Sequence, residues 1–347
     1  MTGILALPAI VKTLLVATLL MRFALPTSAS DEGLACAEEV LNLGFYPYFE
    51  PVSYSAAADP DSAEFNLHRG YEADLLTALE AMDGAGLTFN RQAIADWDGI
   101  WLRSASPEFD IIGGGITILD SRRRDRAGAE AITFTSGHIA FRQSLLVRAE
   151  DARRLKTHAD LTSADRVGVL AGTTGEARLL QLIGLVDDEG VLADGVHAVV
   201  ADGVVIADGS ADFFITAADA TDALAERQVL YLPGTGPQVI YLGSRIGDAE
   251  LLDALANSDI EAIASGEIGN RDAARDSDGD FAVTALDEKP EYGGFTLDID
   301  DAERAACLDA LLNWLTDSRR ISYGEWLEDR AIFFKRAKEW NERREQE

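Results

Sequence analysis

The sequence is short of positive charge. Only five of its 30 basic residues are lysine, and they stand against 60 acidic residues in a chain of 347. The net charge of −30 argues against binding to nucleic acid or to an anionic membrane surface, because both need basic patches. An acid-rich, lysine-poor surface suits a saline medium that screens the self-repulsion. A genome that favours Arg and Asp explains the same composition, and both explanations stay open.

Several motifs of enzymes and metal sites are also missing. The three glycines in "DIIGGGITILDSR" (110–122) and those in "AGTTGE" (171–176) fit no phosphate loop or dinucleotide fingerprint, and no G-x-S-x-G elbow occurs. The four histidines lack metal-ligand spacing. "DSDGDF" (276–281) alternates carboxylates as calcium loops do, but its glycine is misplaced for an EF-hand. We therefore expect no catalytic residues, no cofactor and no bound metal.

Long apolar runs are scarce. The run "TLLVATLLM" at 13–21 lies between Lys12 and Arg22, which leaves too short an apolar span for a bilayer. The small residues "PTSA" follow it, so the pattern predicts an export signal over residues 1–29, cleaved after Ala29. A retained anchor is the alternative. Export predicts a periplasmic or extracellular protein.

Cysteine is nearly absent, with one residue near each end of the expected mature chain, Cys36 and Cys307. In an oxidising compartment an isolated pair is expected to form a disulfide. Two separate buried thiols are the alternative. A bridge would tie the first strand of the mature chain to a helix near the C-terminus.

The sequence is rich enough in apolar residues, at 47% of the chain, to bury a large core. Strand-like and helix-like patterns alternate along it, which predicts α/β units with parallel strands and helices on the sheet faces. In the first part we expect strands at 40–49, 87–94 and 108–117, and helices at 71–82 and 97–105.

Later segments repeat this alternation. A strand, a turn and a helix are expected over 166–184 in a second α/β unit, and a helix over 248–265. The acidic stretch 270–280 is expected to be a loop, with a hairpin-like addition from 281–287 and 294–299. Amphipathic helices are expected at 301–316 and 324–341.

The expected domain organisation has two lobes. Extended crossings near 140–145 and 237–243 predict a two-strand hinge, with the ligand between the lobes. The expected segments are a signal at 1–29, the first part of lobe 1 at 30–142, lobe 2 at 143–240, and a return to lobe 1 with an extended C-terminal helical region at 241–347.

Read in order, these segments resemble the family 3 solute-binding proteins, the periplasmic amino-acid receptors of ABC importers. The resemblance covers about 40–245, and the region 269–347 matches it poorly. The matching pieces are "LNLGFYPYFEPVSY", "GYEADLL", "DWDGIWL", "EFDIIGGGITILDSRRR", "ITFTSG", "QSLLVR", "RVGVLAGTTGEARL" and "GSADFFIT". The resemblance implies a periplasmic-binding-protein-like fold of type II. It also implies a monomer that captures a small carboxylated solute and delivers it to an ABC transporter permease.

The resemblance also implies functional residues. Arg122 corresponds to the arginine that pairs with the ligand carboxylate, a role that suits the planar fork of a guanidinium. Thr117 corresponds to a hydroxyl donor to the same carboxylate, beside Gly115, where the backbone is expected to approach the ligand closely. Thr174 corresponds to the lobe 2 donor at a helix N-terminus. Two further residues correspond to the walls around the ligand side chain, with ordinary core packing as the alternative: Phe49 and Trp97.

One departure from the family pattern concerns the α-ammonium group of the ligand. The aspartate that usually binds it corresponds to Ala217. Burying an ammonium without a counter-charge costs several kcal/mol. Either the nearby Asp219 takes over this role, or the ligand is a carboxylate without an α-ammonium group.

Two other functions are possible on this fold. A periplasmic cyclohexadienyl dehydratase uses an acid in lobe 2, but the corresponding residue is Ala220, which argues against that activity. A soluble co-receptor for a sensor is the other alternative.

Overall fold

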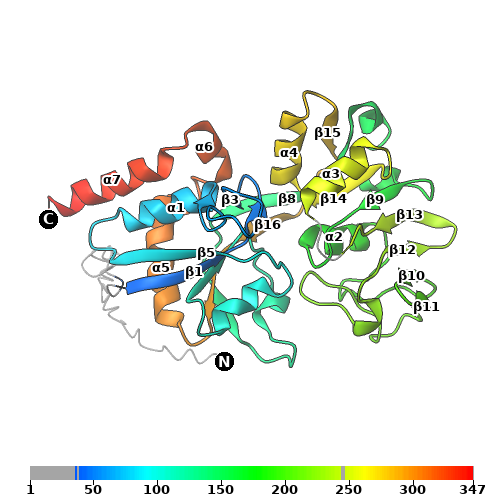
Figure 1. Cartoon of the computed structure of the whole chain (residues 1–347), viewed down its shortest axis with the longest axis horizontal. Helices are drawn as coiled ribbons and strands as arrows, with labels where there is room; N and C mark the ends of the chain where they lie inside the picture. Colours follow the sequence, from blue (N-terminus) through cyan, green and yellow to red (C-terminus); the bar gives the residue numbers. More distant parts are fainter. Residues whose placement is uncertain (1–35, 37–38, 244–246, 347) are drawn as a thin grey trace, which may run out of the picture. The chain divides into compact units, whose positions relative to one another are not determined.

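The computed structural model describes residues 36, 39–243 and 247–346. The expected export signal at 1–29 lies outside these residues. Two large mixed β-sheets, each accompanied by helices, and one small sheet make up the strands of the described part of the chain (Figure 1). Each large sheet belongs to one lobe, so the expectation of two α/β lobes is confirmed.

The sheet of lobe 1 has five strands in the order β5-β1-β6-β17-β7. β1 lies parallel to both β5 and β6, while β17 is antiparallel to β6 and β7. The chain therefore returns to lobe 1 from a distant part of the sequence. The strands are β1 (Glu39–Phe45), β5 (Leu87–Ala93), β6 (Ile111–Gly113), β7 (Ile132–Phe134) and β17 (Thr296–Asp298).

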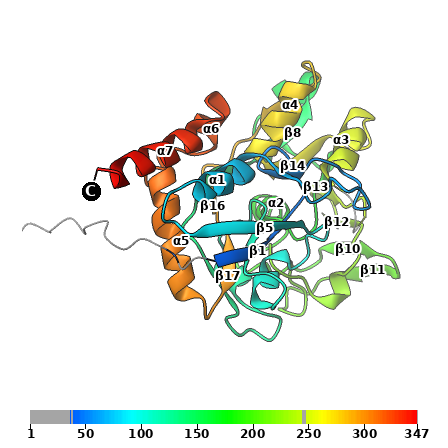
Figure 2. The same cartoon turned by 60° about the vertical axis from the view of Figure 1, so that its left-hand side comes forward.

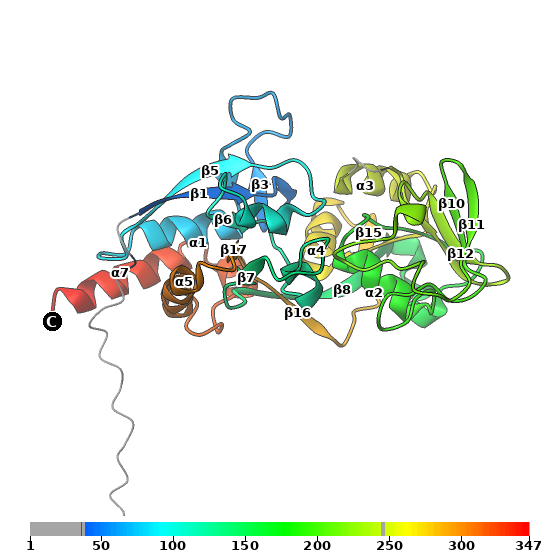
Figure 3. The same cartoon turned by 90° about the horizontal axis from the view of Figure 1, so that it is seen from below.

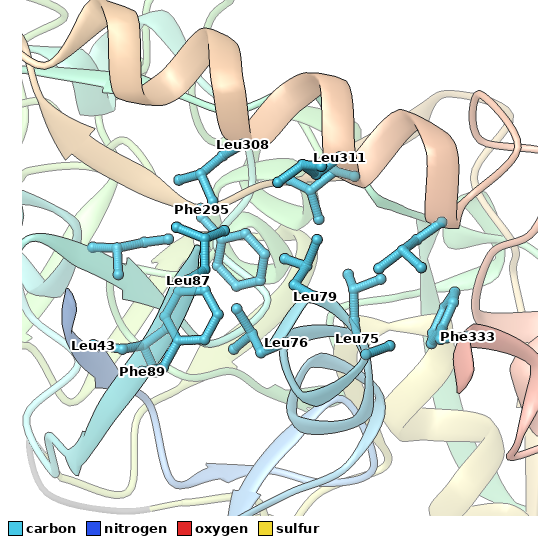
Figure 4. Close-up of a cluster of buried hydrophobic side chains, with 14 of the residues drawn as sticks. Leu43, Leu75, Leu76, Leu79, Leu87, Phe89, Phe295, Leu308, Leu311 and Phe333 are labelled. Carbon is cyan, nitrogen blue, oxygen red and sulfur yellow. The ribbon is translucent and has the colours of Figure 1, made fainter. Parts of the chain in front are cut away.

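Four α-helices accompany this sheet: α1 (Tyr71–Glu80), α5 (Ala302–Leu315), α6 (Tyr323–Glu328) and α7 (Ile332–Arg344). α1 matches the helix expected from its apolar periodicity. Its leucines point toward those of α5 in a shared core (Figure 4), and α7 packs beside α1 (Figures 2 and 3). Trp340 of α7 donates its indole N–H to Asp83 O just beyond α1, at 3.0 Å. The expected C-terminal helical region is thus part of lobe 1.

Short elements complete lobe 1 on the side that faces the candidate site. A small antiparallel sheet is formed by β2 (Tyr48–Phe49), β3 (Ser53–Ser55) and β4 (His68–Arg69). Two 3-10 helices bring the Arg122 guanidinium over the Trp101 ring: η1 (Ile100–Ala105), which contains Trp101, and η2 (Asp120–Arg123), which contains Arg122.

A disulfide joins Cys36 to Cys307, with their Cα atoms 5.8 Å apart. The bridge links the segment before β1 to α5 across 271 residues of sequence. The first and last parts of the described chain are thereby fixed to each other.

The sheet of lobe 2 has the strand order β11-β10-β12-β13-β9-β14-β8-β15, with β16 paired to β8. Three α-helices accompany it: α2 (Thr174–Leu182), α3 (Asp248–Ala256) and α4 (Glu267–Asp276). The strands are β8 (Ile139–Arg148), β9 (Arg166–Gly168), β10 (His197–Val200), β11 (Gly203–Ile206), β12 (Val229–Leu232), β13 (Thr235–Ile240), β14 (Ala262–Gly266), β15 (Phe281–Thr284) and β16 (Pro290–Gly293). The 3-10 helices are η3 (Ala149–Arg153), η4 (His158–Asp160) and η5 (Asp222–Leu224).

The two lobes are connected by β8 and β16, which run antiparallel to each other. The first crossing lies where the sequence predicted it, but the second does not. Residues 237–240 belong to β13, inside the sheet of lobe 2, and β14 and β15 extend that sheet on both sides of β8. The expected return to lobe 1 at residue 241 is therefore wrong, and the return lies at 290–293.

Two local expectations are also corrected. The helix expected over 248–265 ends at Ala256, because Ser258 has φ of 63° and stops it; the buried stretch that follows pairs on both edges as β14. The acidic stretch expected as a loop contains α4, which carries an ion pair between Arg271 and Glu267 at i,i+4 spacing. β15 and β17 belong to different sheets and form no hairpin.

Candidate functional site

A cleft of about 660 Å³ opens between the two sheets, lined by loops and helix ends from both lobes. It brings together every ligand-binding residue proposed from the sequence, although these come from segments up to 170 residues apart. They are Phe49, Trp97, Gly115, Thr117, Arg122, Thr174 and Asp219.

Arg122 is buried at the lobe 1 wall of the cleft, with 1% of its surface exposed. Its Nε and Nη2 atoms both donate to Ala217 O of lobe 2, at 3.1 and 3.0 Å. Nη2 also lies 3.3 Å from Gly172 O, and Nη1 donates to Thr117 O at 3.3 Å. The guanidinium thus spans the two lobes through backbone carbonyls.

The surroundings of Arg122 are otherwise aromatic. The guanidinium carbon lies 4.4 Å from the ring centroid of Trp101 and 5.4 Å from that of Trp97. Burial lowers the pKa of Arg122 to about 9, and attraction by Glu291 opposes part of that shift. No carboxylate forms an ion pair with Arg122 within the described residues. A buried cation therefore sits in the cleft with neutral partners.

Trp97 and Phe49 stand on the lobe 1 side of the cleft. The indole N–H of Trp97 donates to Gly172 O at 3.0 Å, so the residue also reaches across to lobe 2. The ring of Phe49 lies against Gly115, where an added Cβ would come within 2.5 Å of it. Both aromatic residues thus combine a place in the cleft with contacts that hold its walls.

Two of the three glycines at 113–115 bind a protein side chain. The N–H groups of Gly114 and Gly115 donate to the buried carboxylate of Glu72, at 2.7 and 2.9 Å. His138, just before β8, places Nε2 3.1 Å from the same carboxylate. The expected close approach of a ligand to the backbone is therefore limited to Gly115, which lines the cleft.

On the lobe 2 side, Thr174 begins α2 and its hydroxyl faces lobe 1. Thr174 Oγ1 lies 3.5 Å from Thr117 Oγ1 and accepts from Gln143 Nε2 at 2.9 Å. The preceding residue, Thr173, caps the helix by accepting from Glu176 N at 3.2 Å. The helix start is thus fixed by its own sequence.

The buried carboxylate of Glu176 holds the turn that contains Gly172, just before α2. One of its oxygens accepts from Gly172 N at 2.7 Å, and the other from Arg227 and from the Tyr241 hydroxyl at 2.6 Å. Burial raises the pKa of Tyr241 well above its ordinary value, and the charge of Glu176 adds to the shift. This network holds Gly172 where it meets Trp97 and Arg122.

The expected ammonium-binding position is occupied by a buried alanine, Ala217, whose carbonyl is taken by Arg122. Asp219 lies at the cleft but is exposed, and its carboxylate accepts from the N–H of the next residue, Ala220, at 2.8 Å. Asp219 therefore supports its own loop in this structure.

The sequence did not predict a role for Gln143, a cleft residue, or for Glu291, which Gln143 contacts. Gln143 on β8 is 3% exposed and lines the cleft, and its Nε2 also donates to Glu291 Oε2 at 2.9 Å. Glu291 lies on β16, in the region where the family resemblance is weak. Gln143 falls inside the matching piece "QSLLVR", and no local signal marked either residue as functional.

The cleft carries an excess of negative charge. Six carboxylates and three arginines line it; of these, Asp98 pairs with Arg126 at 3.6 Å, and Arg227 pairs with Glu176 beneath the surface. The six carboxylates are Asp96, Asp98, Asp219, Asp222, Glu226 and Asp248.

Comparison with solved structures shows the fold. A substrate-binding protein of an amino acid ABC transporter from Streptococcus pneumoniae, bound to L-arginine, has a TM-score of 0.54 at 16% identity, covering 86% of this chain and 95% of that one. A second S. pneumoniae substrate-binding protein, with bound histidine, has a TM-score of 0.53 at 17% identity, covering 85% and 92%. The expected periplasmic-binding-protein-like fold is therefore confirmed.

Two other proteins are also similar to this chain. An ancestral amino acid-binding protein, a precursor of cyclohexadienyl dehydratase, has a TM-score of 0.52 at 18% identity, covering 87% of this chain and 95% of that one. A probable histidine-binding protein of Neisseria gonorrhoeae is 25% identical over 115 residues, which is 33% of this chain and 39% of that protein. No protein-family model matches the chain. Every helix in the described ranges is too short or too polar to span a membrane.

Proposed function

We propose that this protein is an exported solute-binding receptor that captures an amino acid or a close analogue between its lobes. The observation that carries the proposal is Arg122, a buried cation in the cleft whose partners are neutral carbonyls. A ligand carboxylate would take the place of Ala217 O at Nε and Nη2, because an anion meets this edge of a guanidinium bidentately. Thr117 and Thr174 lie on either side as hydroxyl donors.

The charge of the cleft limits which classes of ligand it can bind. Six carboxylates around the lining disfavour a ligand with an acidic side chain, because like charges repel across a partly desolvated space. The aromatic wall of Phe49 and Trp97 suits a flat or cationic side chain. We therefore expect a neutral or basic amino acid, in keeping with the arginine and histidine bound by the structural relatives.

Delivery to an ABC transporter permease is the second part of the proposal. It is supported by the relatives, whose names place them with amino acid ABC transporters, and by the export signal that the sequence predicts. The proposed partners are thus a small solute and a membrane permease, and the proposed location is outside the cytoplasm.

The test is a thermal-shift screen of the purified protein against the twenty amino acids and their carboxylate analogues, at low and high salt. Binding to the folded state raises the melting temperature by mass action. Arg122→Ala is expected to weaken binding of any hit by roughly 100-fold or more, since it removes a charge-assisted bidentate contact. Arg124→Ala, an exposed arginine two residues on, is the matched control and should bind as the wild type does.

Two results would contradict the proposal. One is the absence of a shift with any carboxylate, and the other is a hit whose affinity is unchanged by Arg122→Ala. Turnover of prephenate by the wild-type protein would replace the proposal with a dehydratase activity. We expect none, because Ala220 supplies no acid at the cleft.

A further inference from the structure

We infer that Glu291 supplies the negative charge that binds the ammonium group of the ligand, in place of the acid absent at Ala217. This inference rests on the proposed function and specifies how the same cleft recognises an amino acid. It assigns a specificity role to β16, one of the two connecting strands.

Glu291 is not itself a lining residue of the cleft, but its strand pairing places it next to residues that are. On β16 it stands opposite Phe141 of β8, and both Phe141 and Gln143 line the cleft. Gln143 Nε2 donates at 2.9 Å both to Glu291 Oε2 and to Thr174 Oγ1. The carboxylate of Glu291 thus meets the Thr174 hydroxyl, which is proposed to receive the ligand, both directly and through Gln143.

The side-chain amide oxygen of Gln143 lacks a hydrogen-bond donor in the described part of the chain. Its two N–H bonds are used by Glu291 and Thr174, and a carboxylate can only accept, so the orientation of the amide is fixed. Gln143 Oε1 is consequently a buried acceptor with no donor among the residues that the structure describes. An ammonium group carries three donors and could serve Glu291 and this oxygen together.

The charges around Arg122 point the same way. Glu291 is the acid whose field acts on Arg122, yet the described hydrogen bonds of the Arg122 guanidinium go to backbone carbonyls and none goes to this carboxylate. Burial raises the pKa of Glu291, although hydrogen bonds from Gln143 and Thr174 and the attraction of Arg122 oppose the shift. A zwitterion with its carboxylate on Arg122 and its ammonium toward Glu291 would compensate both buried charges.

The experiment compares amino acids with analogues that lack only the amino group. Isothermal titration calorimetry measures the affinity for L-arginine and for 5-guanidinopentanoate, and likewise for L-histidine and for imidazole-4-propanoate. The preference is the ratio of the affinity for the amino acid to that for its analogue. The wild type is expected to prefer the amino acid, and Glu291→Gln should reduce that preference by roughly 10- to 100-fold while the analogue binds as well as before or better. Gln is isosteric, and the melting temperature of each ligand-free variant reports whether it folds.

Two further variants distinguish a specific role of Glu291 from a general effect of nearby charge and from a role of Asp219. Glu288→Gln removes an exposed carboxylate three residues before Glu291, and its preference should equal that of the wild type. Asp219→Asn tests the acid suggested by the sequence. If Asp219→Asn abolishes the preference, or if Glu291→Gln leaves it intact, the inference is wrong while the binding function stands. If the wild type binds neither member of either pair and no other carboxylate, the proposed function itself fails.

Discussion

Replacing Arg227 with methionine should destabilise the protein far more than replacing a typical surface arginine. Arg227 is 8% exposed and Glu176 is fully buried, and both the Nε and Nη2 atoms of Arg227 donate to Glu176 Oε1. Methionine retains most of the side-chain volume but removes the charge. The variant would leave the Glu176 carboxylate buried without its cation.

The magnitude follows from the contacts that remain. Removing one partner of a buried ion pair costs about 3–5 kcal/mol, because the other charge stays desolvated. Glu176 keeps its hydrogen bonds from Tyr241 and Gly172, which places the expected loss near the lower end, at about 3 kcal/mol. The matched control is Arg320→Met, which breaks an exposed i,i+3 pair with Asp317 and should cost about 0–1 kcal/mol.

The assay is urea unfolding at neutral pH, followed by far-UV circular dichroism. The double variant with Glu176→Gln and Arg227→Met is expected to recover part of the loss, because the uncompensated buried charge is gone and the amide oxygen still accepts from one of the two remaining donors, Tyr241 or Gly172. A loss below 1 kcal/mol for Arg227→Met, or a double variant less stable than the single one, would refute the reasoning. A weaker affinity for the ligand is also expected, since Glu176 holds the Gly172 turn that meets Arg122.

Two further predictions concern the cleft walls and its pH response. Gly115→Ala should lower stability and weaken ligand binding, because Gly115 has φ of +68° and the new Cβ would meet the Phe49 ring. The control is Gly128→Ala, where φ is +83° and no atom lies within 4 Å of the new Cβ, so this variant has the backbone strain alone. Equal losses of ligand affinity in the two variants would contradict the steric argument. Partial burial raises the pKa of Asp248 to about 6, with a further contribution from Glu250. The folded protein therefore holds the Asp248 proton more tightly than the unfolded chain, so this contribution to stability is present at low pH and is lost as the pH rises through 6. Between pH 5 and 8 the wild type should lose stability relative to Asp248→Asn in urea titrations, and parallel pH profiles would argue against it.

Most of lobe 1 could be predicted from the sequence because its helices and strands have recognisable local sequence patterns. The leucines of α1 recur at helical spacing, and β1 and β5 place apolar residues at alternate positions, as half-buried strands do. The cleft residues of lobe 1 could be predicted because they lie in segments that resemble a family in order and spacing. Arg122 and Thr117 needed only their neighbours in sequence to be recognised.

The hinge and the residues on it could not be predicted, because they depend on pairing between distant strands. Gln143 and Glu291 are 148 residues apart in sequence and meet through the β8–β16 ladder. β13 has the extended pattern expected of a crossing, but its partners are β12 and β9, both in lobe 2. Strand partners are set by tertiary packing, which a single sequence does not record.

The connection between site and hinge follows from β8 alone. His138 precedes this strand and contacts Glu72, whose carboxylate holds the glycine turn at Gly114 and Gly115. Gln143, further along the same strand, contacts Thr174 of lobe 2. A ligand that engages Glu291, as we propose, would contact β16 directly and β8 through Gln143, so it would act on the two strands that connect the lobes.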